Sequence, residues 1–117
     1  MGYHTASGRY ADTLPASLAN GTITATTTSP TIELGDRGTL RLTLLISAAS
    51  GTTPTLDVAV QTSADGSTWS AVAAFAQQTA AGSVRKVFAG MDRYARIVET
   101  VGGTTPSFTR TVSGEAV

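Results

Sequence analysis

The 117-residue sequence has no cysteine and only one histidine, His4. Without cysteine the chain can form neither a disulfide framework nor a thiolate metal site. A zinc site needs further ligands, and a hydrolytic triad needs a histidine held by packed neighbours beside its nucleophile. Residues 63–67 (SADGS) offer one carboxylate, where calcium sites assemble several, so a hairpin turn is the preferred interpretation. We therefore expect no catalytic residue, no metal and no cofactor.

Charge is also scarce. Eight basic and eight acidic side chains make up 14% of the chain and cancel to a formal net charge of zero. Soluble domains carry roughly a quarter of charged residues. Nucleic-acid binding draws much of its affinity from Lys and Arg at phosphates, so this composition argues against a nucleic-acid partner. A weakly charged surface suits a protein packed against partners, because charge keeps monomers apart in solution.

Long apolar runs are missing as well. No run approaches the length of about 18 residues that a membrane-spanning helix needs. The first ten residues, MGYHTASGRY, lack the basic region and apolar core of a signal peptide. We therefore expect no membrane partner, and a protein that is made and assembled in a cytoplasm.

What the sequence does contain is alternation of apolar and polar residues. In residues 54–75 (PTLDVAVQTSADGSTWSAVAAF), every second residue of the first half is apolar, the period of a half-buried strand. Asp65-Gly66 is a turn dipeptide, and Trp69, the only tryptophan, opens a second apolar segment. This stretch predicts a β-hairpin.

Other strands follow the same pattern. Residues 39–47 (TLRLTLLIS) form the strongest one, with four apolar residues on one face, and residues 22–28 predict a threonine-rich edge strand. Further strands are expected over residues 31–34, 83–89, 93–101 and 107–113. Together they predict an all-β fold, an antiparallel β-sandwich of seven or eight strands, jelly-roll or immunoglobulin-like. The expected inner faces include Leu40, Leu42, Leu44, Ile46, Leu56, Val58, Val60, Trp69, Ile97 and Phe108.

A short motif occurs twice. Residues 51–55 (GTTPT) recur as residues 103–107 (GTTPS), each time between two expected strands. The match is too brief to establish duplication, and we interpret it as two similar loops at one end of the sandwich, with proline fixing φ where each following strand begins.

Two side chains interrupt otherwise regular faces. Arg110 lies among apolar neighbours in the last strand, so it must either reach water along its stem or find a carboxylate. Leu45 breaks a polar face. It is either an ordinary exposed apolar residue or is covered by an arm or a partner.

Residues 1–20 show no sustained period and form one predicted segment, followed by a sandwich domain over residues 21–117. The segment is either a frayed terminus or an extended arm that docks on a neighbouring subunit. Aromatic residues are enriched at interfaces, and two of the three tyrosines lie here. The candidate interface residues are Tyr3, Tyr10, Leu14, Leu18 and Leu45.

Several stretches together resemble a known group of proteins. They are the leucine strand ending in SAASGTTPTLDVAVQTSADGSTW, the RYARIV strand, and GGTTPSFTRTV near the C-terminus. In this order they resemble small β-sandwich proteins encoded among the structural genes of tailed bacteriophages, near the capsid genes. The resemblance covers about residues 22–112, and its motifs are moderately specific. That group more often has an aromatic or apolar residue at the position of Arg110, and nothing carries over onto the arm.

The resemblance implies a virion component without catalytic residues, above all a decoration (cement) protein on the outside of the head. We therefore expect a non-enzymatic, homo-oligomeric protein that binds the major capsid protein and stabilises contacts between capsid subunits. Its expected location is the virion head surface, and the host cytoplasm during assembly. Two alternatives stay open: a tail or baseplate component, and a carbohydrate-binding module that stacks a sugar on Trp69 and Tyr94.

Overall fold

The computed structural model describes residues 18–117, which form an antiparallel sheet of seven strands. The all-β prediction is confirmed. This part of the chain contains no helix, and therefore none long and apolar enough to cross a membrane. The strands are β1 (Ala19–Ile23), β2 (Thr27–Thr28), β3 (Ile32–Glu33), β4 (Thr39–Ser63), β5 (Ser70–Ala74), β6 (Gly82–Ala89) and β7 (Tyr94–Ala116).

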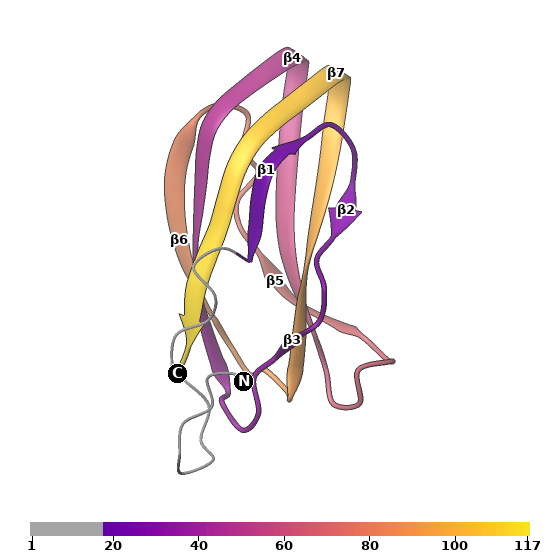
Figure 1. Ribbon diagram of the computed structural model, residues 1–117, viewed down its shortest axis with the longest axis vertical. Coiled ribbons are helices and arrows are strands. Elements are labelled where there is room, and N and C mark those ends of the chain that lie inside the picture. The colour runs from indigo at the N-terminus through magenta and orange to yellow at the C-terminus, as the bar shows by residue number, and fades with distance from the viewer. Residues whose placement is uncertain (1–17) are drawn as a thin grey trace.

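Two long strands, β4 and β7, pair with each other, and each shorter strand pairs with one of them. β4 has 25 residues and β7 has 23, and they pair in antiparallel register from Leu40–Ala116 at one end to Ser63–Tyr94 at the other. Figure 1 shows both strands bending back at the same end of the molecule, so that one sheet folds into two layers. The prediction of separate strands joined by loops is wrong here. The backbone turns the corner while its pairing continues.

The corner consists of the two GTTP motifs. Thr52 pairs with Thr104, and each neighbouring threonine, Thr53 and Thr105, has a positive φ of 47° and 46°. Gly51 and Gly103 have φ values of 112° and 109°, which glycine alone adopts readily. The motifs are therefore not two separate loops but the two halves of one corner, related by an approximate twofold axis. Their similar sequences reflect identical backbone requirements.

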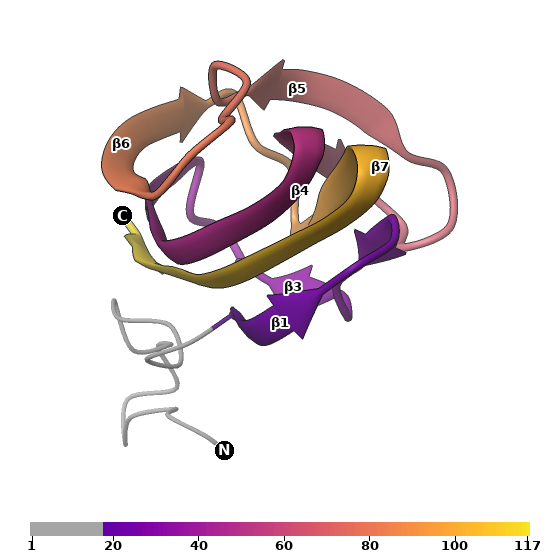
Figure 2. The same cartoon turned by 90° about the horizontal axis from the view of Figure 1, so that it is seen from above.

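Each layer combines half of β4 and half of β7 with shorter strands. In the first layer, β1 pairs with the C-terminal half of β7 and β6 pairs with the N-terminal half of β4. In the second layer, β2 and β3 pair with the N-terminal half of β7, and β5 pairs with the C-terminal half of β4. Seen from above, β1 and β3 flank β7, while β5 and β6 lie on the side of β4 (Figure 2). Residues 22–28 do lie at a sheet edge as predicted, since β1 and β2 each pair with β7 alone, but the predicted single strand is divided between β1 and β2 in different layers.

The hydrophobic core lies between the two layers. Nine of the ten predicted inner residues are buried, among them Leu44 and Phe108 at 0% exposure. At one side Phe75 of the second layer meets Phe88 of the first edge-to-face, with ring centroids 5.5 Å apart. The tenth prediction, Trp69, is wrong: this side chain is half-buried and lies outside the core. It ends the irregular segment between β4 and β5, where the alternation of the preceding strand no longer applies.

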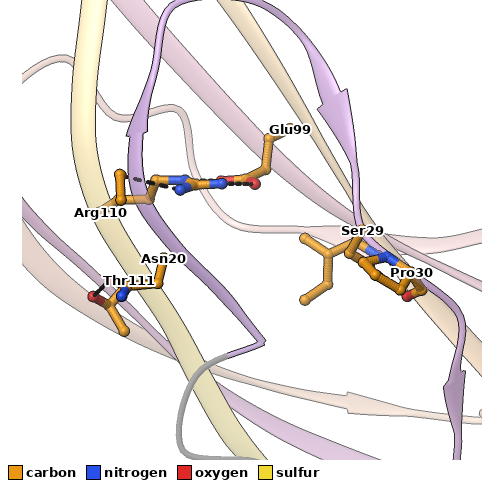
Figure 3. Close-up of polar contacts among 8 residues, drawn as sticks. Asn20, Ser29, Pro30, Glu99, Arg110 and Thr111 are labelled. Atoms are coloured by element: carbon orange, nitrogen blue, oxygen red, sulfur yellow. Dashed lines mark hydrogen bonds and ion pairs between the residues drawn. The ribbon is translucent and has the colours of Figure 1, made fainter.

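Arg110 finds a carboxylate in the core. Its Nε and Nη2 donate to the two carboxylate oxygens of Glu99 at 2.7 and 2.6 Å, and its Nη1 donates to the carbonyl oxygen of Gly21 at 3.0 Å. Figure 3 shows the side chain reaching from β7 toward Glu99. Arg110 and Glu99 are 5% and 1% exposed. The pair therefore joins the two layers and holds edge strand β1 to both.

The turn after β4 is stabilised by one carboxylate. Asp65 Oδ1 accepts hydrogen bonds from the backbone N–H groups of Ser67 and Thr68 at 2.8 and 2.9 Å, and Ser63 Oγ donates to it at 2.9 Å. Gly66 has a φ of 82°, as the predicted turn dipeptide requires. The backbone bonds from Thr68 and Ser67 lower the pKa of Asp65 from its ordinary value of 3.8 to about 2.

We expect the stability of this turn to depend on acid pH. Because the pKa of Asp65 is lower in the folded state, its contribution is present above pH 3.8 and is lost as the pH falls toward 2. Asp65→Ala should lower the melting temperature at pH 7, and the difference from the unmodified protein should be much smaller near pH 2. Thermal denaturation at both pH values measures this. An equal difference at both pH values would contradict the assignment.

Candidate functional surfaces

Residues 18–117 contain no group of three or more His, Cys, Asp or Glu side chains that could hold a metal ion. What the described part of the chain offers instead is two outer sheet faces, one on each layer. Side chains alternate along a strand, so the residues between buried core positions point outward. The chemistry of these two faces differs.

The outer face of the first layer carries mainly hydroxyl groups. Thr22 of β1 and Thr109 of β7 share a hydrogen bond of 2.8 Å, and Thr111 donates to Asn20 Oδ1 at 3.0 Å (Figure 3). Thr43 and Ser113 are register partners in the middle of the same face. One exposed ion pair, Arg41–Glu115 at 3.4 Å, lies at its end. Exposed Arg85, the register partner of Thr43, lies on the same face, so this hydroxyl face is polar and its charged side chains are Arg41, Glu115 and Arg85.

Two apolar side chains stand on the hydroxyl face. Leu45 is 48% exposed and Val87 is 58% exposed. Leu45 pairs with Ser83 on one side and Thr111 on the other, and Val87 pairs with Arg41. Among residues 18–117 nothing covers Leu45. That an arm or a partner covers it stays a prediction.

The other predicted interface residues belong to the N-terminal segment. Tyr3, Tyr10 and Leu14 lie outside the described residues. Leu18 is half-buried, packs against the core, and donates its backbone N–H to the carbonyl oxygen of Val112 at 2.7 Å. Strand β1 begins at Ala19, within the segment of residues 1–20 that the sequence set apart.

The outer face of the second layer has a different composition. The guanidinium of Arg96 lies over the indole ring of Trp69, 4.3 Å from its centroid, and Arg96 Nε donates to Gln61 Oε1 at 2.6 Å. Gln61 and Arg96 are register partners on β4 and β7. This trio places a half-buried aromatic ring beside an amide and a cation.

A second polar pair lies farther along β4. Gln77 Nε2 donates to both carboxylate oxygens of Asp57, at 3.2 and 3.0 Å. Between this pair and the Trp69 trio, Ala59 has Ala74 and Val98 as its register partners. We call these eight residues the polar strip: Asp57, Ala59, Gln61, Trp69, Ala74, Gln77, Arg96 and Val98.

Tyr94 is on the same outer face as Trp69 but has different neighbours. It pairs with Ser63, and a side chain on Gly66 would lie 3.8 Å from its ring, so the turn at Asp65-Gly66 packs over it. The guanidinium of Arg93 lies 5.4 Å from its centroid. Trp69 is therefore grouped with Arg96 and Gln61, residues that the sequence did not single out. The only indication of these two residues in the sequence was that both occupy outward positions in strands of alternating pattern.

No family model matches the sequence, and no curated protein matches it. Among solved structures, the fold is similar to that of a protein described under "CBM4 structure and function", with a TM-score of 0.50 and 19% sequence identity. The alignment covers 75% of this chain and 61% of that one, so the chain spans about three fifths of its length. At this identity the likeness concerns the fold alone. The chain is an antiparallel β-sandwich of the general kind found in that carbohydrate-binding module.

Proposed function

We propose that the chain is a non-enzymatic virion protein of a tailed bacteriophage, a decoration (cement) protein that binds the outer surface of the head. Its partner is the major capsid protein, and it acts as a homo-oligomer without nucleic acid or membrane. Binding across subunit junctions would add buried contacts and stabilise the shell by mass action when the sites are saturated. The resemblance of its sequence motifs to those of phage β-sandwich proteins motivates this proposal.

The observation that carries the proposal is the hydroxyl face with Leu45 and Val87. A broad sheet face with two exposed apolar side chains, many hydroxyls, one exposed ion pair and the exposed Arg85 suits docking on a protein surface. Such a face loses little by desolvation, because few charges leave water on binding. Fluorescent labelling or imaging of intact particles measures the number of copies. Many copies on the head support the proposal, whereas a dozen or fewer would favour a tail component.

A substitution on the hydroxyl face tests the docking surface. Leu45→Asp should weaken binding to stripped heads about tenfold or more, because it places a charge where water is excluded. Thr100→Asp is the matched control, since Thr100 is exposed on the other layer opposite Asp57. Co-sedimentation of purified protein with heads gives both affinities. Equal affinities of the two variants would place the capsid contact elsewhere.

The N-terminal segment is tested by truncation. Because Leu18 packs against the core, deletion of residues 1–17 is the truncation that keeps every described contact. We expect the shortened chain to retain its thermal unfolding transition but to bind heads or self-associate more weakly. Sedimentation velocity and head binding measure the two properties. Unchanged binding and association would make the segment dispensable.

Carbohydrate binding is the second candidate function, and the polar strip favours it. An indole ring beside amide, carboxylate and guanidinium groups can stack on a sugar and bond its hydroxyls. The likeness to a CBM4 fold is consistent with this function. The two candidates use opposite faces, so one chain could carry both.

A further inference from the structure

We propose that the polar strip binds a short, neutral oligosaccharide in extended form, lying along β4 from Asp57 to Trp69. This inference deepens the second candidate function by naming its site and ligand class. It does not depend on the virion role, because the hydroxyl face lies on the other layer.

The spacing of the polar groups matches the length of a short oligosaccharide. Asp57 and Gln61 are four residues apart on one strand, so their Cα atoms are about 13 Å apart. A short oligosaccharide spans that distance. The residues between them are small or apolar: Ala59 is flanked by Ala74 and Val98. The strip thus has polar groups at two ends and, between them, side chains that do not project far enough to block a ligand.

The functional groups match the chemistry of sugar hydroxyls. A hydroxyl both donates and accepts, so it needs acceptors and donors on the protein. At one end, the Asp57 carboxylate accepts and the Gln77 amide oxygen is a further acceptor. At the other, Arg96 Nη groups donate, and the Gln61 amide nitrogen donates because its oxygen already accepts from Arg96. The Arg96 guanidinium covers one face of the Trp69 indole, so a sugar would contact the exposed part of this half-buried ring beside the guanidinium.

These side chains are already held in position. Gln77 holds Asp57, Gln61 holds Arg96, and Arg96 stacks on Trp69. Ordering a long side chain on binding costs about 0.5–1.5 kcal/mol, and preorganisation avoids that cost. The bonds use only part of each group's capacity, so donors and acceptors remain for a ligand.

The charge pattern selects a neutral ligand. Asp57 and Arg96 carry opposite charges, and the described residues that bond them, Gln77 and Gln61, are neutral. A uniformly charged polymer would be attracted at one end of the strip and repelled at the other. An uncharged chain of hydroxyls meets no such penalty.

The test is a titration with neutral β-1,4-linked tetrasaccharides of glucose, xylose and mannose. Trp69 is the only tryptophan, so its fluorescence reports on the site without labelling. We expect a saturable change in emission and matching heat in calorimetry with at least one of the three. Asp57→Ala and Arg96→Met should each weaken that binding about tenfold or more, the first without touching the indole. No saturable signal with any of the three would overturn the inference.

Two controls separate this inference from the others. Arg41→Met removes an exposed arginine on the hydroxyl face and should leave glycan affinity unchanged. If Arg41→Met weakens binding as much as Arg96→Met, the ligand does not occupy the polar strip and the inference fails. Leu45→Asp should affect head binding and not glycan binding. If the unmodified protein binds a tetrasaccharide but not heads, the capsid role alone is removed. If it binds heads but none of the three tetrasaccharides, the glycan site alone is removed.

Discussion

Arg110→Met is expected to lower the free energy of unfolding by about 3–5 kcal/mol, the usual cost of breaking a buried ion pair from one side. The substitution leaves the Glu99 carboxylate 1% exposed and without its bidentate partner. It also removes the donor to the Gly21 carbonyl, and so the link to β1. Urea denaturation followed by Trp69 fluorescence measures the loss. The matched control is Arg41→Met, whose exposed pair with Glu115 should be worth about 1 kcal/mol or less.

The double variant Glu99→Leu/Arg110→Met should recover most of that stability. Replacing both partners of a buried pair by apolar residues is often neutral or stabilising, because no charge is then left without a partner. The β4 register partners of Arg110 and Glu99 are Ile46 and Val58, and both of these residues are apolar and buried. A double variant as unstable as Arg110→Met would show that the pair is needed for packing rather than for charge balance.

Gly51→Ala and Gly103→Ala form the second prediction with a large effect. A Cβ at Gly51 would lie 2.7 Å from the carbonyl oxygen of Thr105, and one at Gly103 would lie 2.6 Å from that of Thr53. Both positions also have φ values near 110°. Backbone strain and overlap together should cost about 3 kcal/mol or more for each substitution. The approximate symmetry predicts similar losses at the two sites.

The control for the corner is Gly38→Ala. A Cβ at Gly38 meets nothing within 4 Å, and its φ lies outside the left-handed region. The free energy of unfolding of Gly38→Ala, measured in urea, should differ from that of the unmodified protein by less than about 1 kcal/mol. If the corner variants are as stable as this control, the close crossing of the two motifs does not exist in solution.

The core was predictable because its period is regular. Alternation in residues 39–47 and 56–60 placed every apolar side chain correctly, since a strand has only two faces. The same regularity failed at two places. Trp69 follows an irregular turn, so its face depends on the turn's length and not on the preceding strand. The GTTP motifs contain glycine and proline, which usually end strands, yet here they let paired strands bend without separating.

The functional surfaces were less predictable than the core, for a physical reason. The sequence left Arg110 either reaching water or meeting one of eight acidic residues, and only the folded chain brings Glu99 to it. Likewise, Arg96, Gln61 and Asp57 each alternate with apolar residues along their strands. From the sequence they therefore looked like ordinary solvent-facing residues. Their grouping comes from the register across strands and from the contact of Arg96 with the Trp69 ring. The alternation pattern of a single strand contains neither the register nor this contact.

The pairing of β4 with β7 also has a consequence for the rate at which the chain folds. Every bond between these strands joins distant parts of the sequence, from Ser63–Tyr94 to Leu40–Ala116. Such a topology must close a large loop before it gains any pairing, and two-state proteins of this kind fold in about milliseconds to seconds. The pair Ser63–Tyr94 closes the smallest loop of this ladder, so loop-closure entropy favours the start of pairing there. Slow closure of that loop, followed by growth of the ladder through the corner into the first layer, is the order of events that this architecture favours.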